Sequence, residues 1–288
     1  MARVLVTGLS GFTGPYLARA LAAAGHDVIG VDVTSGFDLL RPESLAEALA
    51  AHAPDYVVHL AALSSVTHGN AAELYAVNAV GTSNLLEAIA RAQPSVRKVL
   101  LASSANVYGN ADADPIDENV APAPVNHYAC SKLAMEFIAR TWLDRLPIVI
   151  ARPFNYTGPG QTESFLVPKL VAHYARKRPV LELGNIEVER DFSDVKMVVD
   201  AYTRLLAADS AGCVVNICSG IGRSLHSILD ALAAITGHRP EIRVAAHLVR
   251  RAEVHRLVGS NARLRGLIGE LAYTDFDALL REMVAAAA

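Results

Sequence analysis

A glycine-rich turn near the start of the chain constrains the fold more than any other feature. Residues 4–7 predict a strand and residues 14–24 a helix, and between them lie Gly8, Gly11 and Gly14. Glycines at this spacing permit a tight turn, a close approach of the backbone to a pyrophosphate and close helix–strand packing. The backbone N–H groups at the start of the helix then face the negative charge. Three glycines alone are weak evidence, but their place between a strand and a helix predicts a dinucleotide-binding site.

The first half of the chain alternates short apolar runs with alanine- and leucine-rich helical stretches. After the glycine turn, strands are predicted at 27–33, 56–61, 97–103 and 148–152, and helices at 42–51, 72–92 and 128–143. Strands without polar alternation are typical of a parallel sheet buried on both faces. We therefore expect an α/β fold, a Rossmann-type doubly wound parallel sheet with a smaller C-terminal substrate-binding lobe. Residues 1–153 would form the NAD(P)-binding domain and 154–288 mainly the lobe, with about 195–235 returning to the Rossmann part.

Charge and cysteine content exclude several classes of protein. The chain has 26 basic and 29 acidic residues and no like-charged block, so no nucleic-acid or anionic membrane surface is indicated. No apolar run approaches the roughly 20 residues that cross a membrane, and the N-terminus does not resemble a signal peptide. The three cysteines, Cys130, Cys213 and Cys218, lack metal-site spacing, and their odd number argues against a disulfide framework. We expect a cytoplasmic protein without a metal, a nucleic-acid partner or a membrane partner.

An acidic residue at the end of the second predicted strand bears on the choice of cofactor. Asp32 lies 18 residues after Gly14, where a carboxylate can accept hydrogen bonds from ribose hydroxyls and repels a 2′-phosphate. The next residues supply no cation for that phosphate, although Arg41 is not far along the chain. We therefore expect NAD(H) rather than NADP(H), which stays as the alternative. Asp38 follows closely and could meet the adenine amino group. A solvated aspartate at a strand end is the alternative interpretation of Asp32.

A tyrosine and a lysine four residues apart form a candidate acid–base pair. Tyr128 and Lys132 lie on one face of a predicted helix. A nearby ammonium favours the phenolate and lowers the pKa of a tyrosine from about 10. The tyrosine can then exchange a proton with a carbonyl or an alcohol while a nicotinamide moves a hydride. Ser104 follows a predicted parallel strand, at the edge where ligands of such sheets bind, and can hydrogen-bond the reacting oxygen.

These motifs, in this order along the chain, resemble the extended short-chain dehydrogenase/reductase family. The resemblance rests on Gly8-x-x-Gly11-x-x-Gly14, His59-Leu60-Ala61-Ala62, Asn78-x-x-Gly81-Thr82, Ser104 and Tyr128-x-x-x-Lys132. It implies that Ser104, Tyr128 and Lys132 are catalytic and that Lys132 also touches the nicotinamide ribose. Asn78 would be either a structural polar residue or a direct contact. The expected cofactor residues are Gly8, Ser10, Gly11, Phe12, Thr13, Gly14, Asp32, Asp38, Leu39, Leu60, Ala61, Ala62, Tyr128, Lys132 and Pro153.

The same family contains reductases, epimerases and dehydratases of nucleotide sugars. Its 4,6-dehydratases carry an acidic residue two positions after the catalytic serine or threonine, and this chain has Asn106 there. An amide cannot serve as the acid or base for loss of water, so a dehydratase is disfavoured. Reduction and epimerisation both need only hydride transfer and the tyrosine proton relay. A non-catalytic dinucleotide-binding protein is disfavoured because it has no need for Ser104, Tyr128 and Lys132 together.

Motifs in the second half most resemble the GDP-4-dehydro-6-deoxy-D-mannose reductases, which make GDP-D-rhamnose. They are Arg152-Pro153-Phe154-Asn155-Tyr156-Thr157-Gly158-Pro159-Gly160-Gln161, Gly184-Asn185-x-x-x-x-Arg190-Asp191-Phe192-Ser193-Asp194-Val195, Asn216-x-Cys218-Ser219-Gly220, Arg250-x-x-Glu253-Val254 and Val258-Gly259-Ser260-Asn261. The resemblance implies reduction of the 4-keto group of GDP-4-dehydro-6-deoxy-D-mannose by NAD(P)H, with Tyr128 as proton donor. A nucleotide-sugar 4-epimerase that retains NAD is the alternative.

The resemblance also implies where the substrate and a second copy of the chain bind. For Arg190, a surface ion pair with Asp191 or Asp194 is the alternative interpretation. Relatives usually form homodimers through the helices that correspond here to residues 72–92 and 128–143, although burial within a monomer explains their composition equally well. The residues expected to bind a nucleotide-diphosphate sugar, with a GDP-sugar favoured, are Ser64, Ser104, Asn106, Asn155, Val167, Lys169, Arg190, Arg250 and Glu253.

Overall fold

A six-stranded parallel sheet forms the centre of the larger lobe in the computed structural model, which describes residues 1–64, 69–92, 95–249 and 254–287. The chain leaves β1 for β2 on one side and returns to β3 on the other, so the carboxyl end of β1 is a topological switch point, where such sheets bind ligands. The predicted α/β fold with a doubly wound parallel sheet is therefore confirmed. Across the sheet, the strands are β2 (Asp27–Val31), β1 (Arg3–Thr7), β3 (Tyr56–His59), β4 (Lys98–Ala102), β5 (Ile148–Pro153) and β9 (Val214–Ile217).

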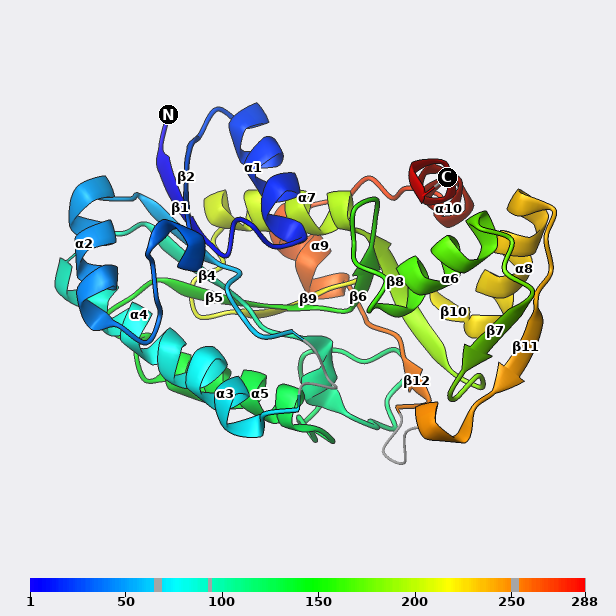
Figure 1. Cartoon of the computed structure of the whole chain (residues 1–288). Coiled ribbons are helices and arrows are strands. Elements are labelled where there is room, and N and C mark those ends of the chain that lie inside the picture. Colours follow the sequence, from blue (N-terminus) through cyan, green and yellow to red (C-terminus); the bar gives the residue numbers. More distant parts are fainter. Residues whose placement is uncertain (65–68, 93–94, 250–253, 288) are drawn as a thin grey trace.

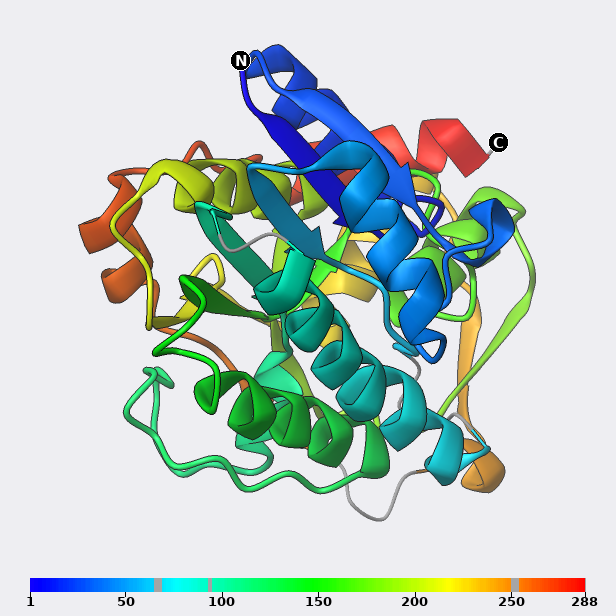
Figure 2. The same cartoon turned by 90° about the vertical axis from the view of Figure 1, so that its left-hand side faces the viewer.

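Helices cover both faces of this sheet, which explains why its strands are apolar without alternation. One face is covered by α1 (Thr13–Ala23), α7 (Val195–Ala207) and α9 (Ala262–Ile268). The other is covered by α2 (Pro42–His52), α4 (Gly81–Ala92) and α5 (His127–Arg140), which lie side by side in Figure 2. The helix expected at 72–92 is present, but it consists of α3 (Ala71–Tyr75), a π-helical segment (Ala76–Val80) and α4.

The smaller lobe lies beside the carboxyl edge of the sheet, because β5 runs directly into its first strand (Figure 1). Its central strand, β8 (Glu189–Asp194), pairs with β6 (Asn155–Thr157), β10 (Gly222–Ser224) and β12 (Arg256–Leu257). A separate pair consists of β7 (Val180–Leu183) and β11 (Glu241–Val244). The lobe's core lies among α6 (Leu166–Ala175), α8 (Leu225–Thr236) and α10 (Phe276–Ala287).

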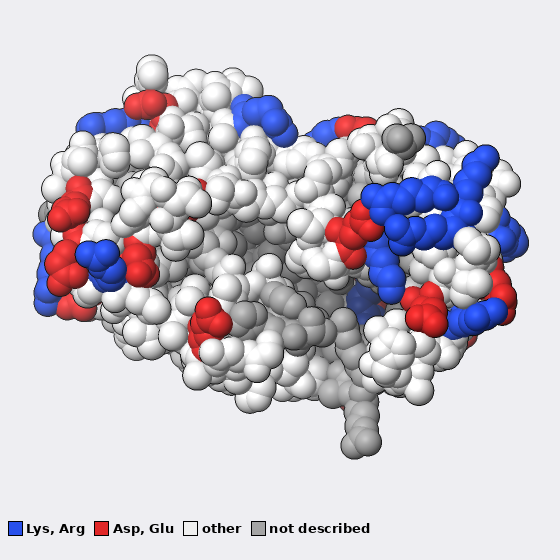
Figure 3. Space-filling view, viewed as in Figure 1, with Lys and Arg blue, Asp and Glu red and all other residues white. Residues whose placement is uncertain are grey.

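The second half of the chain returns to the sheet over a shorter range than 195–235. α7 packs on the sheet and β9 is its last strand, but α8 packs against α6 and α10. In the second half of the chain, residues 195–217 and α9 (Ala262–Ile268) therefore lie on the sheet. The surface is hollowed between the two lobes, above the carboxyl edge of the sheet (Figure 3). Over the described residues, no helix is both long and apolar enough to span a membrane.

Candidate active site

The glycine turn after β1 is shaped partly by the protein's own packing and partly for a ligand. Gly8 has a φ of +74°, and a Cβ there would lie 2.8 Å from the backbone of Ala61. A Cβ at Gly14 would collide with the backbone of Leu9. At Gly11, by contrast, a Cβ would meet among the described residues only the carbonyl oxygen of Gly8, at 3.3 Å. The fold therefore requires Gly8 and Gly14, whereas Gly11 leaves space above the turn.

The start of α1, directly after this turn, suits an anion. Its N-cap is Phe12, whose side chain makes no capping hydrogen bond; the Gly14 N–H donates to the carbonyl oxygen of Gly11 at 3.2 Å and Pro15 has no N–H, so the donors for an anion are those at the very start of the helix. That first turn (residues 13–16) also contains no acidic residue. Free N–H groups at a helix N-terminus bind phosphate. The residues present thus fit the pyrophosphate of a dinucleotide.

Asp32 holds a fixed negative charge beside the turn. One carboxylate oxygen accepts the backbone N–H of Thr34 at 2.9 Å and its hydroxyl at 2.5 Å, and the other accepts the N–H of Ser10 at 3.2 Å. The hydrogen bonds from Thr34, and then those from Ser10, lower the pKa of Asp32 to about 2. The carboxylate is therefore ionised at neutral pH and is placed directly after β2, where a ribose hydroxyl would be read.

A buried histidine joins the ends of β1 and β3 to α4. The Nδ1 atom of His59 lies 2.7 Å from the Thr7 hydroxyl, and Nε2 lies 3.0 Å from the Thr82 hydroxyl. Burial lowers the pKa of His59 to about 3, so the ring is neutral. Because Thr82 donates to the carbonyl oxygen of Asn78, it accepts from His59 Nε2–H, and Nδ1 accepts from Thr7. The Thr7 oxygen also accepts the N–H of Ala61 at 3.2 Å, which fixes the segment after β3.

Asn78 makes three side-chain hydrogen bonds to other residues that the structure describes. Its Nδ2 atom donates to the carbonyl oxygen of Leu63 and to the hydroxyl of Ser131, both at 3.0 Å. Its Oδ1 atom accepts the N–H of Leu63 at 2.9 Å. Ser131 lies on α5 between Tyr128 and Lys132. Asn78 thereby holds the segment after β3 against the helix that carries the candidate catalytic pair.

The structure brings Ser104, Asn106 and Tyr128 together. Ser104 caps the short 3-10 helix Ala105–Tyr108 that follows β4. Its Oγ atom accepts the backbone N–H of Asn106 at 3.2 Å and the side-chain amide at 3.0 Å. The side chain of Ser104 also lies near that of Tyr128, where it acts to lower the pKa of the phenol. Since Oγ already accepts twice from Asn106, its own proton can be donated to another oxygen at the site.

The sequence predicted that Lys132 lowers the pKa of Tyr128, and this lowering is not found in the structure. Burial raises the pKa of Tyr128 to about 12, while the hydrogen bond from Ser104 acts in the opposite direction. The ammonium of Lys132 instead donates to the carbonyl oxygen of Ala102 at 2.7 Å. Burial lowers the pKa of Lys132 to about 8. Tyr128 is therefore protonated at neutral pH, which is the form required of a proton donor.

The pKa of Lys132 predicts how activity depends on pH. The side chain is charged below about pH 8 and neutral above it, although a lysine in water stays charged to about pH 10. The Lys132 charge does not lower the pKa of Tyr128 here, but in catalysis it would stabilise the phenolate formed when Tyr128 gives up its proton. That charge is lost in this window, so we expect kcat/KM to fall as the pH rises past about 8. The Lys132→Met variant should lose most of its activity, and its residual rate should lack this limb. A wild-type profile with no descending limb there would refute the assignment.

A buried ion pair fixes the helix that carries this site. Arg152 Nε donates to Glu136 Oε1 at 2.9 Å, and Nη2 donates to Oε2 at 2.6 Å. Both side chains are almost inaccessible to solvent. The hydroxyl of Ser103 also donates to Oε1, at 2.5 Å. The pair joins α5 to β5 and to the end of β4. The sequence interpretation missed it, although Glu136 continues the four-residue spacing of Tyr128 and Lys132 along one helix face.

The segment after β5 lies against the glycine turn. The hydroxyl of Tyr156 lies 2.9 Å from that of Thr13, and the rings of Tyr156 and Phe12 are stacked with centroids 6.1 Å apart. Tyr16 donates to the carbonyl oxygen of Pro159 at 2.7 Å. Tyr156 also interacts electrostatically with Tyr128. It lies in a motif noted in the sequence, but its contact with Thr13 could not be foreseen across 143 residues.

The other expected cofactor residues end or follow the strands β2, β3 and β5 at the carboxyl edge of the sheet. Leu60 and Ala62 follow β3 and are half-buried, and Pro153 ends β5. Asp38 accepts the N–H of Leu40 at 2.9 Å, and Leu39 is buried against Gly81 of α4. No group of three or more potential ligands among the His, Cys, Asp and Glu residues in the described ranges is placed to hold a metal ion.

Among the expected substrate residues, Asn155, Val167, Lys169 and Arg190 lie in the smaller lobe. Asn155 and Val167 line a small cavity together with Phe192. The cavity adjoins the start of α6, where no side chain of the described residues provides a cap and the first turn contains no acidic residue. Lys169 donates to the carbonyl oxygen of Glu182 on β7 at 2.9 Å.

Arg190 contacts carbonyl oxygens rather than the two aspartates considered for it. Its Nη1 atom donates to the carbonyl oxygens of Glu189 at 2.9 Å and His255 at 3.2 Å. Asp191 accepts instead from Ser219 and Gly220, and burial raises its pKa. Ser64 is exposed. Arg250 and Glu253 lie outside the described residues.

A family model matches residues 4–218 and is described as the NAD dependent epimerase/dehydratase family. The chain belongs to this family. The resemblance inferred from the sequence motifs is thereby confirmed. The fold of this family accounts for the glycine-rich turn from Gly8 to Gly14 after β1. As a member, the protein is an NAD(P)-dependent enzyme.

Individual members are similar over nearly their whole length. A GDP-6-deoxy-D-talose 4-dehydrogenase from Aggregatibacter actinomycetemcomitans is 37% identical, covering 98% of this chain and 96% of the relative. A GDP-6-deoxy-D-mannose reductase from Pseudomonas aeruginosa is 40% identical, covering 93% and 91%. The solved structure of RMD from Pseudomonas aeruginosa complexed with NADPH has a TM-score of 0.89 and 39% identity, covering 100% of this chain and 97% of that one.

Proposed function

We propose that the protein reduces the 4-keto group of a GDP-linked 4-keto-6-deoxyhexose with NAD(P)H. The observation that carries the proposal is that Ser104, hydrogen-bonded to the amide of Asn106, lies near a protonated Tyr128 at the carboxyl edge of the sheet that also carries the glycine-rich turn. This set provides a proton donor for a carbonyl oxygen and no carboxylate at the position where the family's 4,6-dehydratases place one. The two relatives at 37% and 40% identity carry names of enzymes that act on GDP-linked 6-deoxyhexoses.

The side chains of the site would guide the proton to the substrate oxygen. The nicotinamide supplies the hydride when the cofactor is bound. Tyr128 Oη would donate its proton to O4 of the sugar as C4 becomes tetrahedral, which converts the ketone to an alcohol. Ser104 would hydrogen-bond the same oxygen, and its position is held by Asn106. The ammonium of Lys132 would stabilise the phenolate left at Tyr128.

The smaller lobe would bind the nucleotide half of the substrate. The uncapped start of α6 offers free N–H groups to a second diphosphate, beside Asn155 and Val167. Arginines bind diphosphates through paired donors, which is the role we propose for Arg190 and Arg250. Glu253 would accept hydrogen bonds from ribose hydroxyls. Lys169 is close enough in sequence to the start of α6 to add charge there.

Identification of the product tests the proposal and defines its stereochemistry. D-Mannose and D-talose differ only at C4, so the names of the two relatives correspond to opposite configurations at the reduced carbon. We expect GDP-4-dehydro-6-deoxy-D-mannose and NADH to give GDP-D-rhamnose, identified by nuclear magnetic resonance. The talose product would reverse the stereochemical assignment and keep the reaction class. Absence of any reduced sugar would overturn the proposal.

Removing the charge at Asp32 is expected to relax cofactor preference toward NADPH. In the Asp32→Asn variant the repulsion of a 2′-phosphate is lost, so kcat/KM with NADPH relative to NADH should rise about tenfold, which corresponds to about 1.4 kcal/mol. The ratio is measured with both cofactors under the same conditions. Asp27→Asn, at the opposite end of β2, is the matched control and should leave it unchanged. An unchanged ratio in Asp32→Asn would contradict the proposed contact with the ribose.

We further propose that two copies associate through the helices of residues 72–92 and 128–143. Val80 is 52% exposed and Phe137 is 55% exposed, and both lie on this layer of helices. Large apolar side chains on an outer helical layer favour burial against a partner. Light scattering should give twice the mass of one chain, and the Phe137→Glu variant should shift it toward the monomer. A monomeric wild type at micromolar concentration would refute this interface.

A cytoplasmic location is also proposed, on the basis of the cysteines. Cys130, Cys213 and Cys218 are all free thiols in the structure. Unpaired cysteines are typical of reducing compartments. Fractionation of the source cells with activity measured in each fraction tests the location, and activity recovered outside the cytoplasmic fraction would refute it.

A further inference from the structure

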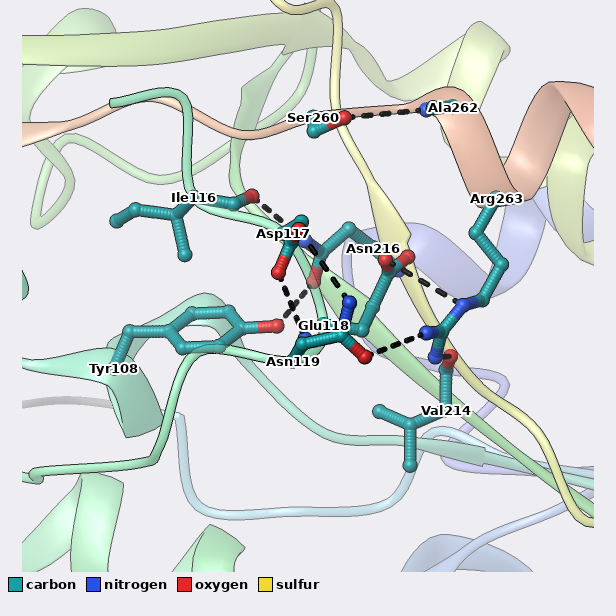
Figure 4. Close-up of polar contacts among 10 residues, drawn as sticks. All are labelled: Tyr108, Ile116, Asp117, Glu118, Asn119, Val214, Asn216, Ser260, Ala262 and Arg263. Carbon is teal, nitrogen blue, oxygen red and sulfur yellow. Dashed lines mark hydrogen bonds and ion pairs between the residues drawn. The ribbon is translucent and has the colours of Figure 1, made fainter. Parts of the chain in front are cut away.

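A buried asparagine on β9 connects two parts of the molecule that meet at the proposed site. Asn216 is fully buried and is paired across the sheet with Arg152 of β5. It belongs to a motif noted in the sequence, Asn216-x-Cys218-Ser219-Gly220, to which no role is assigned above. Figure 4 shows Tyr108, Ile116 and Glu118 converging on it.

The first connection leads to the turn that carries Ser104. Tyr108 ends the 3-10 helix that Ser104 caps, and its ring is fully buried beneath the guanidinium of Arg152, 4.8 Å from the ring centroid. The hydroxyl of Tyr108 donates to Asn216 Oδ1 at 2.7 Å. Burial raises the pKa of Tyr108 to about 12, so this donor keeps its proton. The turn from Ser104 to Tyr108 is thereby tied at its far end to β9.

The second connection leads to the segment that follows this turn in the chain. Asn216 Nδ2 donates to the carbonyl oxygen of Ile116 at 3.0 Å, and its backbone N–H donates to Glu118 Oε1 at 2.8 Å. The carboxylate of Glu118 is only 3% exposed, and its second oxygen lies 3.6 Å from Arg263 Nε. Arg263 belongs to α9 and also donates to the carbonyl oxygen of Val214, which lies on β9 two residues before Asn216. One asparagine thus organises a buried polar cluster.

The segment held in this way lies alongside the chain that leaves the smaller lobe. Asp114 pairs with Arg256 through two bonds of 2.9 and 3.0 Å. Ile116 donates its N–H to Val258 and accepts that of Ser260, at 2.9 and 2.8 Å. Glu118 contacts Arg263, as described above. Residues 114, 116 and 118 therefore contact residues 256–263, and both segments run in the same direction along these contacts. Arg256 itself belongs to β12, which pairs with β8 in the centre of the smaller lobe.

We propose that Asn216 is a positioning residue, which holds the Ser104–Tyr108 turn in a fixed relation to the smaller lobe. The inference rests on the proposed function, because the turn would contact the sugar while the lobe would bind the nucleotide. At its centre, around Asn216, Tyr108 and Glu118, this hydrogen-bond network is buried, so loss of one member is expected to displace the others. The placement of Ser104 at the reacting oxygen would change. The glycine-rich turn after β1, where the cofactor would bind, lies outside the network and would keep its position. Displacements of this size lower the rate of the chemical step.

Two variants test this role, with a third as control. Asn216→Ala removes the central amide, and Tyr108→Phe removes only one hydroxyl and therefore serves if the first variant folds poorly. Asn119→Ala is the matched control, because Asn119 contacts Arg263 at 3.3 Å within the same segment without bonding to Asn216. We expect kcat to fall about tenfold in Asn216→Ala and about threefold in Tyr108→Phe, with KM for NADH within about twofold. The deuterium isotope effect with 4-deuterated NADH should be at least as large as in wild type, which places the loss in the chemical step.

Hydrogen exchange provides a readout that does not require turnover. Backbone amides of residues 104–110 should exchange faster in Asn216→Ala and Tyr108→Phe than in wild type, and at the wild-type rate in Asn119→Ala. If wild type does not reduce the GDP-sugar, the proposed function fails, and hydrogen exchange still decides the positioning role. Unchanged kcat per folded molecule, or unchanged exchange in residues 104–110, would overturn the inference.

Discussion

Replacing Tyr128 with phenylalanine is expected to lower kcat by about 10²–10⁴-fold. The change removes only the phenol proton that we assign to the sugar oxygen, and the ring keeps its packing on α5. Burial raises the pKa of Tyr128 to about 12, so the wild-type residue carries this proton throughout the physiological range. The loss should therefore appear at every pH tested below that value. Steady-state kinetics measure kcat, and titration with NADH measures cofactor affinity, which should change less than about twofold.

A second tyrosine provides the control for this change. Tyr273 lies outside the proposed site, and its hydroxyl accepts from Asn261 Nδ2 at 2.6 Å. Tyr273→Phe removes the same atom from the protein and should leave kcat unchanged. If Tyr128→Phe retains most of the wild-type turnover, Tyr128 is not the proton donor. If cofactor affinity falls in parallel with kcat, the loss belongs to binding and not to proton transfer.

Breaking the buried ion pair beneath the site is expected to have the largest effect on stability. In the Glu136→Ala variant, the guanidinium of Arg152 would remain buried without its carboxylate, which typically costs about 3–5 kcal/mol. Burial of Arg152 opposes its charge, and the hydrogen bonds and charge of Glu136 outweigh that opposition, since the pKa of Arg152 is raised. The free energy of unfolding is measured with a chemical denaturant. The variant should also lose activity, because α5 carries Tyr128 and Lys132.

The exposed pair of Arg176 with Glu163 is the natural comparison. These side chains are also joined by two hydrogen bonds, of 2.7 and 3.1 Å, but they are 44% and 50% exposed. Solvent screens such pairs, so Glu163→Ala should lower the free energy of unfolding far less than Glu136→Ala does. Equal losses in the two variants would show that burial of the Glu136 pair contributes nothing special to the fold.

The sequence was sufficient for the features that depend on local spacing. The order of strands and helices followed from apolar runs and their lengths, and Gly8 to Gly14 marked the first βα turn. Ser104 and Tyr128 could be linked from the sequence. Ser104 follows a predicted strand, at the edge where parallel sheets bind ligands, and Tyr128 lies in the predicted helix that comes next in the chain. The family resemblance then supplied the class of reaction, and the comparisons agree with it.

Features that depend on which distant residues meet could not be derived in the same way. Nothing in the periodicity indicates that Glu136 pairs with Arg152, or that Tyr108 reaches Asn216 across 108 positions. The pKa of Tyr128 was misjudged because spacing places Lys132 on the same helix face, whereas packing directs its ammonium to Ala102. The helix of residues 225–236 was expected to belong to the Rossmann part, as the end of the range 195–235. Its sequence pattern shows an apolar face but does not show which element covers that face.

Transfer of deuterium from NADH to the sugar tests the central claim most directly. The enzyme would be incubated with GDP-4-dehydro-6-deoxy-D-mannose and stereospecifically 4-deuterated NADH, with each face of the nicotinamide labelled in turn. The account predicts that one of the two labels appears at C4 of the product sugar, with one NADH consumed for each sugar reduced. Absence of label and of NADH consumption with the 4-keto sugar, together with interconversion of GDP-D-rhamnose and GDP-6-deoxy-D-talose without added cofactor, would contradict this reduction and identify the protein as an epimerase that retains its cofactor.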